Sequence, residues 1–207
     1  ITSQIEHHAI LHACESIERL GYPVAYLPVD NEGIVSPDIL SSFITDETRL
    51  VSVMLVNNEI GTIEPISELA KVAHRHGAVF HTDAVQAVGH IAINVKELGV
   101  DMLSASAHKF NGPKGIGFIY IKSGTKIYPY ADGGAQEHGM RAGTENIASI
   151  VGMAAALKKN CDHMDQTQNK LHQLEDKFLD VLKLSGIDFT RNGSANHVPG
   201  NVNVSIR

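Results

Sequence analysis

The sequence predicts an α/β protein with a doubly wound, mostly parallel sheet flanked by helices, on three observations. Short runs rich in β-branched residues alternate with runs of helical periodicity along most of the chain. The segment RLVSVMLV (49–56) is nearly continuously apolar, which is typical of a strand buried on both faces of a parallel sheet. Polar residues follow three of the strands at their carboxyl ends, where such sheets bind ligands.

Helical signals mark four segments of the chain: 6–20, 37–44, 66–76 and 147–184. Gly21 and Gly77 end the first and third segments. Ser36 is a candidate N-cap, with Pro37 at the first helical position. The last segment is expected to form one long helix or two consecutive helices.

Strand patterns occupy the stretches between the helices: 23–29, 49–56, 78–85, 101–108 and 115–121. Two further patterns, GIDFTRNG (186–193) and GNVNVSI (200–206), follow the long helical segment. We therefore expect a large domain over residues 1–145 that is incomplete at its N-terminus. Residues 146–207 are expected to form a helical linker and part of a smaller domain, so that the chain is a piece of a longer protein.

Composition excludes several classes of function. The chain has 207 residues and a net charge of −6, which disfavours a nucleic-acid or anionic-membrane partner. No apolar run approaches the roughly 20 residues that span a bilayer. The two cysteines give neither a disulfide framework nor metal-ligand spacing, which favours a reducing cytoplasm. His8 and His12 lack a second ligand pair, so no metal site is expected.

Lys109 stands out in the segment SASAHKFNGPKGIG (104–117), directly after a strand and before a turn rich in Gly and Pro. Lysines usually keep their charge in water, and a surface lysine is the plain interpretation. A lysine amine with a depressed pKa instead attacks carbonyl carbons and forms a Schiff base. The neighbouring strand ends decide which interpretation holds.

Asp83 ends the strand in AVFHTDAV, and a carboxylate there suits the protonated ring nitrogen of pyridoxal phosphate. The alternative is that Asp83 caps a short helix beginning at Ala84. Asn58 and Gln86 carry amides that suit a phenolic oxygen, although either is equally ordinary in a loop.

Ser106 and His108 flank the lysine and suit a phosphate group, together with backbone N–H groups of the turn. The alternative for Ser106 is a hydroxyl bonded to the local backbone. His7 is placed to stack on an aromatic ring, or else is a surface residue at the start of a helix.

Five segments in unbroken order resemble the cysteine desulfurases: TSQIEHHA, VNNEIGTIEPI, HTDAVQAVG, SASAHKFNGPKGIG and HGMRAGTEN. These are enzymes dependent on pyridoxal 5′-phosphate within the class V aminotransferases, and the resemblance is closest to those that serve nitrogenase and general Fe–S assembly. It implies the large domain of an aspartate aminotransferase-like fold, with the start of a smaller α+β domain.

The resemblance implies a role for each candidate residue. Lys109 and His7 are the catalytic residues, Lys109 through a Schiff base and proton transfer, His7 by stacking on the cofactor ring. The other cofactor-binding residues are Asp83 at the ring nitrogen, Asn58 and Gln86 at the ring oxygen, Ser106 and His108 at the phosphate, and Thr144 at the phosphate of a neighbouring subunit. The implied enzyme is therefore a homodimer.

The implied reaction converts L-cysteine to L-alanine and an enzyme-bound persulfide, which passes to an Fe–S scaffold or another sulfur acceptor. The family's mobile cysteine loop has no match here, and Cys14 and Cys161 are expected to be buried and inert, so this chain alone is expected to be inactive. Two alternatives stay open: a selenocysteine lyase or small-molecule aminotransferase on the same fold, and a non-catalytic interaction module for Fe–S assembly.

Overall fold

The computed structural model describes residues 1–207 and contains two sheets. The strands of the large sheet are β1 (Thr2–Ser3), β2 (Tyr26–Leu27), β3 (Leu50–Ser52), β4 (Val79–Asp83), β5 (Met102–Ser106) and β6 (Gly117–Ile121). The first four helices are α1 (His8–Arg19), α2 (Pro37–Phe43), α3 (Ile66–Arg75) and α4 (Val95–Leu98). Short 3₁₀ turns follow at η1 (Ala107–Phe110) and η2 (Glu137–Gly139).

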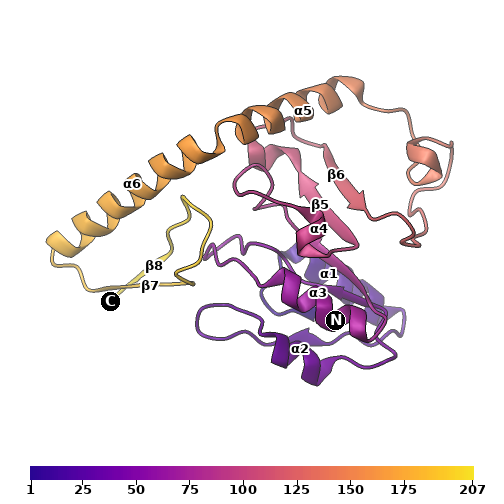
Figure 1. The fold of residues 1–207 in the computed structure, drawn as a ribbon, viewed down its shortest axis with the longest axis horizontal. Helices are drawn as coiled ribbons and strands as arrows, with labels where there is room; N and C mark the ends of the chain where they lie inside the picture. Colours follow the sequence, from indigo (N-terminus) through magenta and orange to yellow (C-terminus); the bar gives the residue numbers. More distant parts are fainter.

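The large sheet has the order β2-β1-β3-β4-β5-β6 and confirms the predicted fold class. All pairs are parallel except the last, in which β6 runs antiparallel to β5. The chain therefore moves to one side from β1 to β2 and to the other side for every later strand. Because crossover connections are right-handed, α1 lies on one face of the sheet and α2, α3 and α4 lie on the other. Figure 1 shows α1 behind the sheet and α2 and α3 in front of it.

The two faces differ in polarity. Alternate residues of the central strands, such as Val51, Phe80 and Leu103, point toward α3 and join its apolar residues in a core of 24 buried side chains. The opposite face carries Ser52, His81, Asp83, Ser104 and Ser106, by strand register. A polar sheet face at this position suits a ligand better than it suits core packing.

The C-terminal third contains α5 (Ile147–Asp162), α6 (Met164–Leu184), β7 (Phe189–Arg191) and β8 (Val204–Ile206). The predicted helical segment is two helices, which follow each other at His163 as a long rod along one side of the molecule (Figure 1). Strands β7 and β8 form a separate antiparallel pair. None of the helices is long and apolar enough to cross a membrane.

Local signals predicted most elements and missed the shortest. Ser36 caps α2 as expected, accepting from the Ile39 N–H at 3.2 Å. Strand β1 and helix α4, of two and four residues, are too short to produce a periodic pattern. The 49–56 strand is regular only over Leu50–Ser52, and its continuation is buried extended chain that includes a bridge from Val56 to Ile63.

Candidate active site

The candidate residues lie at the carboxyl ends of parallel strands, as expected. His7 follows β1, Asn58 follows the extension of β3, Asp83 ends β4, and Ser106 ends β5. Because these strands pair in parallel, their carboxyl ends share one edge of the sheet. Four segments that are far apart in sequence therefore bring polar groups to one place.

Lys109 occupies the turn η1, directly beyond β5. Its neighbours Ala107 and Phe110 are fully buried, while the Lys109 side chain is exposed. Two side chains hold the backbone of this turn: His90 Nε2 donates to the Lys109 carbonyl at 2.9 Å, and Asn160 Nδ2 donates to the Phe110 carbonyl at 2.8 Å. The turn is thus anchored from the 85–90 loop and from α5, and the lysine amine makes no hydrogen bond or ion pair within the chain.

Asp83 is buried at 8% exposure and pairs in register with Ser104 of β5. Its Oδ1 accepts from the Val85 N–H at 2.9 Å. Residues 85–90 form hydrogen-bonded turns and no regular helix, so Asp83 caps a turn rather than the short helix considered as the alternative. A buried carboxylate with a second oxygen free of protein partners suits a cationic ring N–H.

A polar row that sequence reasoning missed lies beside Asp83 on the same face. His81 Nδ1 is 2.8 Å from Ser52 Oγ, and its Nε2 is 3.1 Å from Ser104 Oγ, so that the row spans β3, β4 and β5. Burial lowers the pKa of His81, against the charge of Asp83, which raises it. The imidazole is therefore held neutral. His81 lies two residues before Asp83 on the same strand, so the alternation of strand faces could have placed both side chains on one face.

His7 is the N-cap of α1, and its Nδ1 accepts from the Ala9 N–H at 3.1 Å. The ring is exposed at the carboxyl edge. The preceding Glu6 is buried and was not singled out from the sequence. Its Oε1 accepts from Ser3 Oγ at 2.7 Å and from the Met54 N–H at 2.8 Å. Burial raises the pKa of Glu6 to about 7, so this carboxyl group is mainly a neutral acid near pH 6. It joins the turn before α1 to the chain just after β3.

The remaining candidates divide into two groups. Asn58 and Gln86 are half-buried at the edge, and neither side chain is used in a hydrogen bond within the chain. Ser106 Oγ is 2.8 Å from His108 Nδ1, a side-chain pairing rather than the local backbone bond considered from the sequence. Thr144 lies in the exposed 122–146 segment, which projects from one end of the molecule beyond β6 (Figure 1).

The two cysteines differ from each other, and the prediction that both are buried is wrong for Cys161. Cys14 is half-buried on α1, and burial raises its thiol pKa. Cys161 is exposed near the end of α5. Helix α5 contacts η1 and packs on the core through Met153, Ala156 and Leu157, and Cys161 is not among these packed residues.

Comparison with known proteins agrees with this geometry. The whole chain, residues 1–207, matches the family described as aminotransferase class-V. It is 52% identical over 207 residues to a protein of Dictyoglomus turgidum named cysteine desulfurase IscS, covering 100% of this chain and 52% of that protein. The chain spans about half the length of the curated relatives it matches.

Solved structures show the same fold. One titled NifS-like protein has a TM-score of 0.93 at 36% identity, covering 99% of this chain and 56% of the other. Another, titled SspA in complex with cysteine, has a TM-score of 0.86 at 34% identity, covering 100% of this chain and 57% of the other.

Proposed function

Because the chain belongs to the aminotransferase class-V family, we propose that its parent protein is a cysteine desulfurase dependent on pyridoxal 5′-phosphate. Such an enzyme breaks the C–S bond of L-cysteine, releases L-alanine and keeps the sulfur as a protein persulfide. The names of the similar proteins support this assignment. The observation that carries it is the pairing of β4 with β5, which places Asp83 and the Lys109 turn on neighbouring strand ends.

The donor set at the edge fits this cofactor. The buried Asp83 carboxylate suits a ring N–H, and the two amides without partners suit a ring oxygen. The hydroxyl–imidazole pair suits a phosphate, and the Lys109 amine, which has no partner, suits an aldehyde. None of these groups except the hydroxyl–imidazole pair bonds to another in the set. They are therefore available to a ligand at little cost in internal hydrogen bonds.

When bound, pyridoxal phosphate supplies an electron sink for the carbon centre of the amino-acid substrate. Lys109 would hold the cofactor through its amine and would move protons at Nζ. Asp83 would accept a hydrogen bond from the ring nitrogen and so keep that nitrogen protonated. Asn58 and Gln86 would donate to the ring oxygen, and His7 would stack on the ring. Ser106 and His108 would hold the phosphate.

We further propose that the parent protein is a homodimer in which Thr144 reaches the phosphate of the neighbouring subunit. The exposed segment that carries Thr144 also exposes Tyr128 and Tyr130 at 94% and 104%. The adjacent α5 exposes Ile147 and Val151. Aromatic and aliphatic side chains gathered around one projecting segment suit a protein interface.

The remaining parts of the proposal concern sulfur transfer and organisation. Cys14, whose thiol pKa is raised, and Cys161, on a helix, do not match a mobile thiolate loop, so we expect the 207-residue chain alone not to turn over cysteine. The acceptor is an Fe–S scaffold or another sulfur-accepting protein in the cytoplasm, where unpaired cysteines persist. Residues 1–145 form the cofactor domain, and residues 146–207 form the linker and part of the smaller domain.

The test is an absorbance titration of the chain with pyridoxal phosphate. We expect the visible band that this cofactor gives when joined to a lysine, lost in Lys109→Ala and kept in Lys114→Ala, a control in the same loop. The parent protein should then form alanine and persulfide from L-cysteine. A preference for selenocysteine, or amino transfer without persulfide, would replace the proposal with a lyase or aminotransferase. No band in the parent protein would favour an interaction module.

A further inference from the structure

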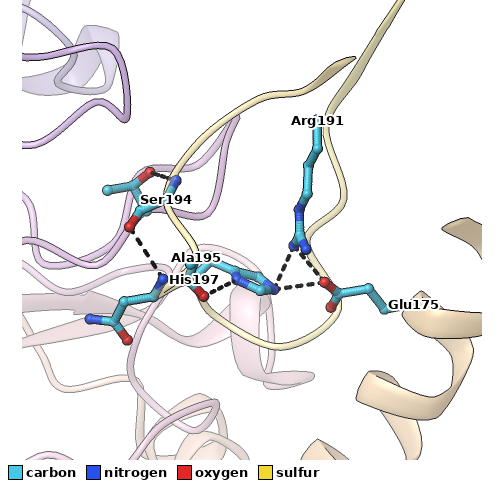
Figure 2. Close-up of polar contacts among 7 residues, drawn as sticks. Glu175, Arg191, Ser194, Ala195 and His197 are labelled. Atoms are coloured by element: carbon cyan, nitrogen blue, oxygen red, sulfur yellow. Dashed lines mark hydrogen bonds and ion pairs between the residues drawn. The ribbon is translucent and has the colours of Figure 1, made fainter. Parts of the chain in front are cut away.

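A buried charged cluster joins α6 to the end of β7 and to the segment between β7 and β8. Glu175 of α6 is 6% exposed, and its Oε1 is 2.5 Å from Arg191 Nη2 and 2.8 Å from His197 Nε2 (Figure 2). Burial alone would raise the pKa of Glu175, but hydrogen bonds and charge from His197 and Arg191 hold it below its usual range. The carboxylate therefore stays charged and keeps both partners in place.

The His197 ring is fixed from both sides. Its Nδ1 donates to the Ala195 carbonyl at 2.9 Å, because a carbonyl oxygen only accepts. Its Nε2 lies between the Glu175 carboxylate and Arg191 Nη2, which is 2.7 Å away. With a proton, Nε2 donates to Glu175, and without one it accepts from Arg191. The ring thus keeps a partner in this cluster in either protonation state.

The backbone of His197 pairs with the turn that follows β3. His197 forms an antiparallel bridge with Thr62, and the Val198 N–H donates to the Gly61 carbonyl at 2.9 Å. The Ile63 N–H donates to the Asn196 carbonyl at 3.1 Å. These bonds attach a segment near the C-terminus to a turn more than a hundred residues earlier.

Side chains and close backbone contact reinforce this attachment. Thr62 Oγ1 accepts from the Ser194 N–H at 3.0 Å and donates to the Glu32 carbonyl at 2.6 Å. A Cβ at Gly193 would lie 2.6 Å from the Ile60 carbonyl oxygen, so only glycine fits there at its φ of +88°. The two segments therefore approach as closely as backbones allow.

The attached turn is the one that carries Asn58. The Asn57 N–H donates to the Thr62 carbonyl at 2.9 Å, and the Gly61 N–H donates to the Asn57 carbonyl at 3.1 Å. Asn58 lies inside this closed turn and has no bond of its own to fix it. Its position therefore depends on what holds the turn on either side of it: the Asn57 side chain before it, and Gly61, Thr62 and Ile63 after it.

We propose that Glu175 is a positioning residue for Asn58: through Arg191 and His197 it holds the 192–198 segment against the 57–62 turn and so aims the Asn58 amide at the carboxyl edge. This inference rests on the proposed cofactor role of Asn58. Glu175 touches neither cofactor nor substrate and acts only through the turn.

Amide hydrogen exchange tests the inference without any cofactor. In Glu175→Gln we expect the Gly61 and Ile63 amides to exchange about tenfold faster or more, because the charged hydrogen bonds that hold His197 are lost. The Leu55 amide, bonded to the Asp83 carbonyl within the sheet, should be unchanged. Asp180→Asn is the matched control, since it removes an exposed α6 carboxylate paired only with Lys183. His197→Ala should reproduce the effect if Glu175→Gln does not fold.

Faster exchange confined to residues 191–198 would overturn the inference, because the cluster would then serve only its own segment. Exchange that becomes faster at Leu55 by as much as at Gly61 and Ile63 would also overturn the inference, because it would indicate global destabilisation. A second readout is affinity for pyridoxal phosphate in Glu175→Gln, Asn58→Ala and the double variant. The two changes should be non-additive, whereas additive losses would contradict the coupling. If the parent protein binds no cofactor, the proposed function fails while the exchange result still decides the role of Glu175.

Discussion

Asn57 and Ile5 join the two turns that carry the candidate residues His7 and Asn58: Asn57 Nδ2 donates to the Ile5 carbonyl at 2.9 Å. The same side chain accepts through Oδ1 from the Glu59 and Ile60 N–H groups at 2.9 and 3.0 Å. Asn57 thus cross-links two strand ends, whereas its neighbour Asn58 is left free for a ligand.

This contrast between adjacent asparagines is testable. Asn57→Ala leaves the part-buried Ile5 carbonyl and the N–H groups of Glu59 and Ile60 without partners, and should lower the free energy of unfolding by about 1–3 kcal/mol. Asn58→Ala should change stability by less than about 0.5 kcal/mol and weaken binding of pyridoxal phosphate. Urea unfolding at pH 7 measures the first effect and absorbance titration the second. Equal stability losses would contradict the division of roles.

Glu64 should make stability fall as pH rises. It is 3% exposed, and the only hydrogen bond to its carboxyl group comes from the Val35 N–H at 2.9 Å. Burial raises the pKa of Glu64 to about 8, so the folded state holds a proton that the unfolded state loses near pH 4.5. The stabilisation is complete below pH 4.5 and is lost as pH rises through 8.

Glu64→Gln keeps the acceptor for Val35 and removes the titration. We expect its unfolding free energy to exceed that of the unsubstituted chain at pH 8.5 and to fall less between pH 5 and pH 8.5, a difference on the order of 4 kcal/mol at most. Glu47→Gln, at an exposed position, is the control. Identical pH slopes for the chain and Glu64→Gln would show that Glu64 is ionised in the folded state.

Asp101 should have the opposite pH dependence. Burial by itself would raise the pKa of Asp101. Its carboxylate accepts from the Phe80 N–H at 2.9 Å and contacts His74 at 2.7 Å and Lys122 at 3.4 Å. These partners outweigh the burial and hold the pKa below its usual range. Stability from Asp101 is therefore present above pH 3.8 and is lost as pH falls through the lower folded pKa.

Asp101→Asn should cost about 2–3 kcal/mol at pH 7, because it leaves His74 and Lys122 without their charged acceptor. The cost should shrink toward pH 3, which thermal unfolding over that range measures. Asp46→Asn, whose carboxylate is 96% exposed, should cost little at any pH. A pH-independent loss in Asp101→Asn would assign the effect to packing instead.

The fold was predictable where local patterns are long. Helix α3 was expected over 66–76 and spans Ile66–Arg75, since its apolar residues recur at helical spacing and Gly77 ends it. The edge position of Asp83 and Lys109 also followed from strand order alone. Strand β1 was not predicted because its two residues carry no periodicity, although it pairs with both β2 and β3.

The buried side chains that hold the candidate site in place were not predictable, because their hydrogen-bond partners are distant in sequence. Glu6 looks like an exposed residue at the start of a helix, and its burial depends on the Met54 N–H, 48 residues later. Glu175 looks like one of many charged residues on α6, and only the return of Arg191 and His197 buries it. The exposure of Cys161 was also not predicted, because no local pattern indicates that its position on α5 is uncovered.

The central claim is that Lys109 attaches the cofactor. The most direct measurement is to incubate the chain with pyridoxal phosphate, reduce it with borohydride, digest it and locate the pyridoxyl group by mass spectrometry. We predict modification of Lys109 at near-stoichiometric level, with Lys114 unmodified. Modification spread over exposed lysines, or its persistence at the same level in Lys109→Ala, would contradict the claim.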